Sequence, residues 1–234
     1  MATQHDPGLV DFIGVTYHDP RFPQPLLEDI DFSIAPGEAV TLTGPSGSGK
    51  TTALGLALGA SQISRGEVLV LGRNPSRLSG AELTQLRTRV GYVAQHGALL
   101  GNLSLLDNLA LPLRYHRHTD ERQTSTLMAA ACALLDLDLD DVPRVQPAMA
   151  SAEMRHLVAL AKALVLEPLI LLLDEPGSGL GGNAAREYWR LLTQLRSRRP
   201  LAMLIAATDL PSDRIAADRT IALPPRVEHV RERG

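Results

Sequence analysis

The segment GPSGSGKT at residues 44–51 has the residue types and spacing of a phosphate-binding loop. It matches the pattern G-x-x-x-x-G-K-S/T and lies between a predicted strand and the predicted helix TTALGLALGAS. Glycines let backbone N–H groups close around a phosphate chain, and the helix N-terminus adds partial positive charge. We expect Lys50 to reach the β and γ phosphates and the Thr51 hydroxyl to bind Mg²⁺. The predicted nucleotide-binding residues of the loop are Gly44, Pro45, Ser46, Gly47, Ser48, Gly49, Lys50, Thr51 and Thr52.

Two acidic residues end the apolar run LILLLDEP at residues 169–176. Asp174 is predicted to hold Mg²⁺ through water, and Glu175 to polarise the water that attacks the terminal phosphate. Acids at this position can also cap the following helix. Their place after a phosphate-binding loop favours the metal and base assignment.

Length, composition and charge indicate one folded unit. The 234 residues are 44% hydrophobic and 21% charged, as in ordinary globular domains. A net charge of −3 offers no basic surface, so nucleic acid is not expected as a partner. The single cysteine, Cys132, lies in an apolar run and is expected to be a buried thiol in a reducing compartment.

No targeting or membrane segment is expected. The N-terminal MATQHDPGLVDF lacks the layout of a signal peptide, so we expect a cytosolic protein. The most apolar segment, residues 157–173, is interrupted by Lys162, Glu167 and Pro168. It falls short of the uninterrupted apolar length that a membrane span needs, and reads as a buried helix, a proline break and a buried strand.

The order of predicted elements indicates an α/β fold with a largely parallel sheet covered by helices on both faces. In the first strand, Ile13, Val15 and Tyr17 are expected on one face. Residues 97–162 lack strand patterns and are predicted to form a helical insertion. The predicted strands lie at residues 10–19, 29–35, 38–44, 66–72, 90–95, 169–174, 201–208 and 219–223, and further helices at 79–89, 183–199 and 211–219.

These motifs, in this order and spacing, resemble the nucleotide-binding subunits of ABC transporters over nearly the whole chain. The residues that carry the resemblance are GPSGSGKTT, GYVAQ, ALAKAL at 159–164 and LLLDEP. The resemblance implies a single P-loop NTPase domain over residues 1–234, with an antiparallel β subdomain and the helical subdomain at about 97–162. It implies ATP and Mg²⁺ as ligands, with Tyr17 stacking on adenine and Gln95 touching Mg²⁺ while sensing the membrane subunit. The implied partners are an integral membrane transporter subunit and a second nucleotide-binding subunit, at the cytoplasmic face of the membrane.

The chain departs from the family in the parts that act across the subunit interface. The family's signature sequence falls on residues 150–154, where only Ser151 is retained, beside Ala152 and Glu153. Glu153 replaces a glycine that faces the partner's γ-phosphate, and two like charges about 4 Å apart repel by about 4 kcal/mol at an effective dielectric constant of about 20. That repulsion is an upper guide, because Glu153 could turn outward or pair with Arg155.

Two further positions differ from the family pattern. Gly181 stands where the family has an aspartate, and Thr208 stands at the position of the family's switch histidine. A threonine hydroxyl is shorter than an imidazole and cannot become cationic. Loss of one preorganised donor typically costs about 10²–10³ in rate. We therefore predict that the chain binds Mg-ATP and hydrolyses it slowly or not at all as a homodimer.

The segment HGALLGNLSLLDNLALPLRY at residues 96–115 resembles ATPases of the Mla or Mce-type phospholipid transporters. Lipoprotein-releasing and peptide-exporting ABC subunits share part of it, so that alternative stays open. Within the segment, Ser104 is predicted to cap a helix. His116 and His118 are interpreted as part of a solvated basic loop rather than as metal ligands.

Three alternatives to a homodimeric transport motor remain open. The chain could be a regulatory or structural partner whose bound ATP closes an interface without turnover. It could be an ABC-type protein that acts on nucleic acid or the ribosome, although the acidic balance weighs against this. It could also pair with an intact subunit in a heterodimer, which would favour one of the two ATP sites.

Overall fold

The computed structural model describes residues 8–21, 23–95, 97–116, 119–208 and 217–225. Its centre is a five-stranded sheet in the order β5-β6-β7-β3-β8. Every neighbouring pair in this sheet is parallel, as the alternation of strands and helices predicts. The strands are β5 Val90–Val93, β6 Ile170–Asp174, β7 Ala202–Ala207, β3 Ala39–Thr43 and β8 Arg219–Ala222.

A second sheet is antiparallel and has the order β2-β1-β4. It consists of β1 Val10–Tyr17, β2 Leu27–Ile34 and β4 Arg65–Val70. The predicted pair of strands around the turn at Pro36 and Gly37 is present, but its members belong to different sheets, β2 to this one and β3 to the parallel one. The chain therefore has the antiparallel subdomain and P-loop NTPase core that the resemblance implies.

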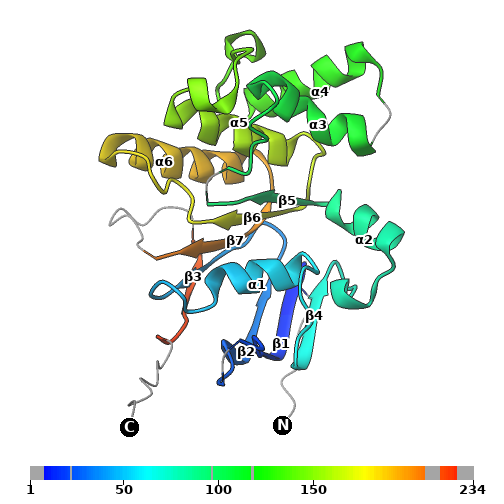
Figure 1. Cartoon of the computed structure of the whole chain (residues 1–234), viewed down its shortest axis with the longest axis vertical. Helices are drawn as coiled ribbons and strands as arrows, with labels where there is room; N and C mark the ends of the chain where they lie inside the picture. The colour runs from blue at the N-terminus through cyan, green and yellow to red at the C-terminus, as the bar shows by residue number, and fades with distance from the viewer. Residues whose placement is uncertain (1–7, 22, 96, 117–118, 209–216, 226–234) are drawn as a thin grey trace.

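The helices divide between the two faces of the parallel sheet (Figure 1). α3, α4 and α5 gather at one end of the molecule, and α6 lies between α5 and the parallel sheet. α1 lies on the opposite side, between the parallel and antiparallel sheets, and α2 lies beside β4 and β5. The predicted helical region at 97–162 contains α3 to α5 and continues to Leu164. The bounds are α1 Lys50–Ala57, α2 Gly80–Arg87, α3 Leu105–His116, α4 Glu121–Ala133, α5 Ala152–Leu164 and α6 Gly182–Arg198.

The alternation of side chains in β6 builds two hydrophobic cores. Leu171 and Leu173 face the core shared with α3 to α6, whereas Ile170 and Leu172 face the core shared with α1 and the antiparallel sheet. A strand buried on both faces needs the continuous apolar run that the sequence shows. The buried Cys132 belongs to the first core, and burial raises the pKa of its thiol to about 11.

The first strand differs from its predicted pattern. Ile13 is 37% exposed, whereas Phe12 and Val15 are buried, so Ile13 and Val15 do not share a face. The cause is an irregularity between Phe12 and Val15, where Gly14 adopts a φ of 54°. An extra residue in one strand reverses the alternation beyond it, which period-two reasoning does not anticipate.

The end of β5 differs from its prediction, and the helix predicted at 211–219 cannot be compared with the structure. β5 ends at Val93, and Gln95 follows in a turn rather than closing the strand as predicted. Most of the helix predicted at 211–219 lies outside the described residues. Among the residues that are described, no helix has the length and apolar character needed to cross a membrane.

Candidate functional site

The phosphate-binding loop follows β3, an interior strand of the parallel sheet, and runs directly into α1. Gly49 is the N-cap residue of α1 and has a φ of 96°, in the left-handed region that favours glycine. A Cβ atom at this position would lie 2.6 Å from Cδ2 of Leu27 on β2. Glycine is therefore required here both for the turn and for the close approach of the loop to the antiparallel sheet.

Lys50 is the first residue of α1, and its ammonium group folds back over the loop. Nζ donates to the carbonyl oxygens of Gly44 at 2.8 Å and Pro45 at 3.1 Å. It also lies 3.6 Å from Oε1 of Glu175. The side chain is only 6% exposed, so these oxygens replace the water that a lysine normally binds. A bound phosphate group could pair with the Lys50 ammonium in place of these oxygens.

Thr51 and Asp174 meet at the carboxyl end of β6. The Thr51 hydroxyl donates to Oδ1 of Asp174 at 2.9 Å, although the two residues lie 123 positions apart in the sequence. Asp174 is 4% exposed, and burial raises its pKa, opposed by the hydrogen bond from Thr51. An exposed hydroxyl beside a buried carboxylate offers oxygen ligands of the kind that Mg²⁺ prefers.

Glu175 follows Asp174 and is fixed to the end of β7. Its φ of 46° is unusual for a residue with a side chain. Its backbone N–H donates to the carbonyl of Ala206 at 2.7 Å. Its carboxylate accepts the Thr208 hydroxyl at Oε1, at 2.5 Å, and the Thr208 N–H at Oε2, at 3.0 Å. The residue at the switch position therefore binds the predicted catalytic base directly.

These groups surround a cavity of about 400 Å³. It brings together most of the predicted site residues, and adds two that the sequence did not single out, Leu26 and Ser178. Leu26 carries no motif, whereas Ser178 lies in the glycine-rich loop after Pro176, which offered a weak signal. The lining consists of Leu26, Ser46, Gly47, Gly49, Lys50, Thr51, Thr52, Gln95, Glu175, Ser178 and Thr208.

Five of the residues predicted to bind the nucleotide or the metal are not among those that line this cavity: Tyr17, Gly44, Pro45, Ser48 and Asp174. Asp174 reaches the site through its hydrogen bond to Thr51, and Gly44 and Pro45 through their carbonyl bonds to Lys50. Tyr17 ends β1, where its carbonyl accepts the N–H of Leu26 at 2.8 Å. The stacking of Tyr17 on adenine stays a prediction.

The cavity fits a magnesium-bound nucleoside triphosphate. Oγ of Ser48 is buried in the loop and has no hydrogen-bond partner among the described residues. A Cβ atom added to Gly47 would meet nothing within 4 Å, so the loop leaves open space on that side. Backbone N–H groups, the Lys50 cation and the Thr51–Asp174 pair would thus supply donors for phosphate oxygens and oxygens for the metal.

The degenerate signature segment lies at the start of α5. Ser151 is the N-cap residue, and its Oγ accepts the N–H of Met154 at 3.1 Å. Glu153 lies in the first turn and is exposed. It makes no ion pair or hydrogen bond with the described part of the chain. Arg155 does not pair with it, because its Nη1 donates instead to the carbonyl of Ala150 at 2.6 Å.

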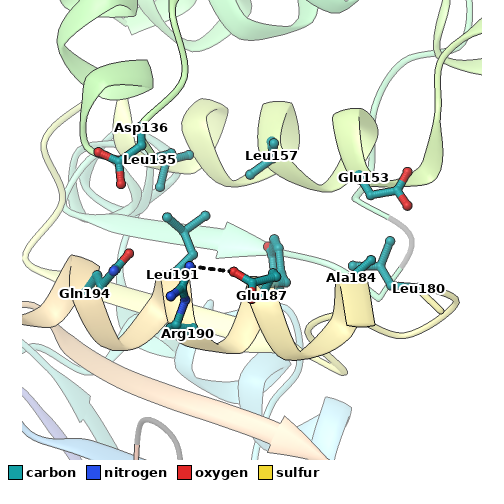
Figure 2. A pocket seen from close by; sticks show the side chains of 11 residues that line it. Leu135, Asp136, Glu153, Leu157, Leu180, Ala184, Glu187, Arg190, Leu191 and Gln194 are labelled. Carbon is teal, nitrogen blue, oxygen red and sulfur yellow. Dashed lines mark ion pairs between the residues drawn. The ribbon is translucent and has the colours of Figure 1, made fainter. Parts of the chain in front are cut away.

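Figure 2 shows Glu153 at one end of a second cavity, of about 390 Å³, between α5 and α6. Its carboxylate points away from Glu187 and Arg190, which form an ion pair of 2.7 Å on α6. None of Ser151, Ala152 and Glu153 lines the nucleotide cavity of the same chain. This segment therefore does not contribute to the nucleotide cavity of its own chain.

Of the other two altered positions, Thr208 lines the nucleotide cavity, whereas Gly181 does not. Gly181 is the N-cap residue of α6 and supplies no side-chain capping bond, and a Cβ atom there would meet nothing within 4 Å.

Ser104 caps α3 as predicted, accepting the N–H of Asp107 at 3.0 Å. His116 ends α3, and His118 lies outside the described residues.

Comparisons with known proteins agree with this geometry. The family model of ABC transporters matches residues 27–178. The sulfate/thiosulfate import ATP-binding protein CysA 1 of Chromobacterium violaceum is 36% identical over 199 residues, covering 84% of this chain and 54% of that protein. The probable ribonucleotide transport ATP-binding protein mkl of Mycobacterium bovis is 34% identical over 191 residues, covering 82% and 53%. The chain spans about half the length of these relatives.

Solved structures show the same fold. The dimeric structure of MJ0796, a bacterial ABC transporter cassette, has a TM-score of 0.81 and 25% identity, covering 92% of this chain and 94% of that one. The structure of cbiO1 from Clostridium perfringens has a TM-score of 0.81 at 21% identity, covering 93% and 85%. The family model over residues 27–178 and the relatives at 34–36% identity show that the chain belongs to the ABC transporter family, as an ATP-binding domain.

Proposed function

We propose that the chain binds Mg-ATP in the cavity at the end of β3 and couples that binding to a membrane transporter. The observation that carries the proposal is the convergence of three groups on one cavity. Lys50 presents a buried cation, Thr51 and Asp174 form a 2.9 Å pair for the metal, and Glu175 stands at the cavity wall. Residues from α1, β6 and the end of β7 are thus brought within reach of one triphosphate.

Each group has a distinct role in this proposal. Lys50 neutralises the β and γ phosphates after leaving the carbonyls of Gly44 and Pro45. Thr51, Asp174 and Gln95 would hold Mg²⁺, which would neutralise the charge that builds up on the phosphates. Glu175 orients the attacking water. Backbone N–H groups of the loop hold the remaining phosphate oxygens.

We further propose that hydrolysis by a homodimer is slow or absent. Glu153 is exposed in the first turn of α5 and lacks a partner within the described residues, so its charge is available to repel a partner's ATP. Thr208 supplies no cation to the γ-phosphate. An intact second subunit would relieve the first defect at one of the two sites.

A lipid or phospholipid substrate is our proposal for the transporter. Its support is the likeness of residues 96–115 to Mla or Mce-type ATPases. The relatives named above carry sulfate, thiosulfate and ribonucleotide in their names, and lipoprotein or peptide export is the alternative. We place the chain at the cytoplasmic face of the membrane, bound to an integral membrane subunit and to a second nucleotide-binding subunit.

A regulatory partner that binds ATP without turnover is the second candidate function. The altered Glu153, Gly181 and Thr208 favour it. The geometry of Glu175 weighs against it, because a strained backbone and three fixed hydrogen bonds hold this carboxylate at the cavity. Strain of this kind persists where it serves a function.

Calorimetric titration with Mg-ATP tests the binding proposal. We expect Lys50→Ala to weaken binding by about 10- to 150-fold, since hydrogen bonds to charged groups contribute about 1.5–3 kcal/mol. Lys162→Ala is the matched control, because Lys162 lies outside the cavity and donates to the carbonyl of Ala98 at 3.1 Å. Equal affinities of the wild type and Lys50→Ala would contradict the proposal.

A further inference from the structure

Both carboxylate oxygens of Glu175 are held by a single residue, Thr208. The hydroxyl donates to Oε1 at 2.5 Å and the backbone N–H donates to Oε2 at 3.0 Å. The two residues lie 33 positions apart and meet because Asp174 of β6 stands opposite Ala206 of β7. This register places Glu175, which follows β6, beside Thr208, which follows β7.

The backbone of Glu175 is fixed to the same strand. Its N–H donates to the carbonyl of Ala206 at 2.7 Å, and its φ is 46°. A non-glycine residue in this left-handed region costs about 1–3 kcal/mol and persists only when its surroundings determine it. Both the main chain and the side chain of Glu175 are thus oriented by the end of β7.

The carboxylate has room on two sides. Glu175, Ser178 and Thr208 line the nucleotide cavity and also a third cavity, of about 450 Å³, that extends to Trp189. Arg186 lines this third cavity, but its guanidinium donates to Asn183. Packing alone therefore does not fix the direction of the carboxylate, and the hydrogen bonds from Thr208 do.

Lys50 cannot serve as this anchor once a nucleotide is bound. Its Nζ lies 3.6 Å from Oε1 of Glu175 and donates at closer range to two loop carbonyls. A bound triphosphate would take the ammonium for itself. The two donors of Thr208 are uncharged and belong to the end of β7, so they stay with Glu175.

We propose that Thr208 is a positioning residue for Glu175, holding its carboxylate toward the nucleotide cavity in place of a histidine. The inference rests on the proposed function and deepens it, because it states which group keeps the base usable despite the altered switch position. Thr208 then acts through Glu175 and needs no contact with the γ-phosphate.

Single-turnover cleavage of Mg-ATP, with enzyme in excess, tests the inference even when turnover is slow. We expect Thr208→Val, which removes only the hydroxyl, to lower the rate by about 10- to 100-fold, as small misplacements of reacting groups do. ATP affinity should change by less than about twofold, since the base contributes little to ground-state binding. Thr208→Ser should restore the rate to within about threefold of the wild type.

Two comparisons separate positioning from a structural effect. In a Glu175→Gln background, Thr208→Val should lower the residual rate no further, because residues that act as a unit are not additive. Thr126→Val is the matched control, since this threonine is exposed on α4 and donates to the carbonyl of Arg122. It should leave rate and affinity unchanged.

Three results would overturn the inference while leaving ATP binding intact. These are equal rates for the wild type and Thr208→Val, an equal fall in rate on adding Thr208→Val to Glu175→Gln, and a wild-type rate no higher than that of Glu175→Gln. Failure of the wild type to bind Mg-ATP would instead refute the proposed function itself.

Discussion

Replacing Glu153 by glutamine should change the stability of the monomer and the closure of the ATP dimer in opposite directions. In the monomer, Glu153 lies in the first turn of α5. A carboxylate there interacts favourably with the helix dipole by about 0.3–1 kcal/mol. Its loss should lower Tm by about 1–4 °C, given about 2–4 °C per kcal/mol for a chain of this size.

In the dimer, the same substitution removes a charge that faces the partner's γ-phosphate in our proposal. At about 4 Å, two unit charges repel by about 1 kcal/mol in water and about 4 kcal/mol at an effective dielectric constant of about 20. The exposure of Glu153 favours the lower value. A homodimer contains two such contacts, so closure should gain about 2 kcal/mol, or about 30-fold in the dimer dissociation constant.

Sedimentation in the presence of Mg-ATP measures this closure, with Glu175→Gln in every variant to prevent turnover. Glu121→Gln is the matched control, because Glu121 is also exposed in the first turn of a helix, α4. It should lose similar stability and leave the dimer unchanged. Equal dimer dissociation constants for Glu153→Gln and its parent would refute the proposed clash.

Three further outcomes follow from the described geometry. Asp174→Asn should raise the Tm of the nucleotide-free protein at pH 8 and weaken Mg-ATP binding. The pKa of Asp174 is raised by burial, so its ionised form opposes folding at high pH, and the gain should vanish as pH falls through that raised pKa. Ser151→Ala should lower the free energy of unfolding in urea by about 0.5–2 kcal/mol, because the α5 cap is lost, whereas Ser125→Ala within α4 should not. Cys132 should resist thiol reagents at pH 8 and react only as denaturant unfolds the chain, since it is buried with a pKa of about 11.

The layered fold was predictable because its strongest signals are local. The run from Leu169 to Leu173 indicates a strand buried on both faces, and the Ser79–Glu82 spacing indicates the helix start that α2 shows, with a complete capping box. The order of strands was not predictable in the same way. β3 pairs with β7 and β8, which lie more than 150 residues later, and such pairings depend on packing that no short segment encodes.

The first strand shows how a local rule fails. Gly14 is an ordinary residue in the sequence, yet its left-handed conformation reverses the side-chain alternation and exposes Ile13. A glycine within a strand often marks a β-bulge of this kind.

The site residues also differ in whether the sequence alone could predict them. Lys50, Thr51, Asp174 and Glu175 belong to contiguous motifs, so their chemistry could be inferred from spacing alone. Leu26 reaches the cavity from a segment without a motif, and Ser178 from a glycine-rich loop with only a weak signal. The hydrogen bonds between Thr208 and Glu175 depend on the register of β6 and β7, which the core packing sets.

Mg-ATP binding and steady-state hydrolysis on one purified sample test the central claim most directly, with Lys50→Ala and Glu175→Gln as controls. We predict Mg-ATP binding that Lys50→Ala weakens by about 10- to 150-fold, together with wild-type turnover far slower than that of a subunit with an intact signature and switch histidine. Brisk turnover by the wild-type homodimer, abolished in Glu175→Gln, would show that the altered signature and switch positions are compensated and would contradict our account.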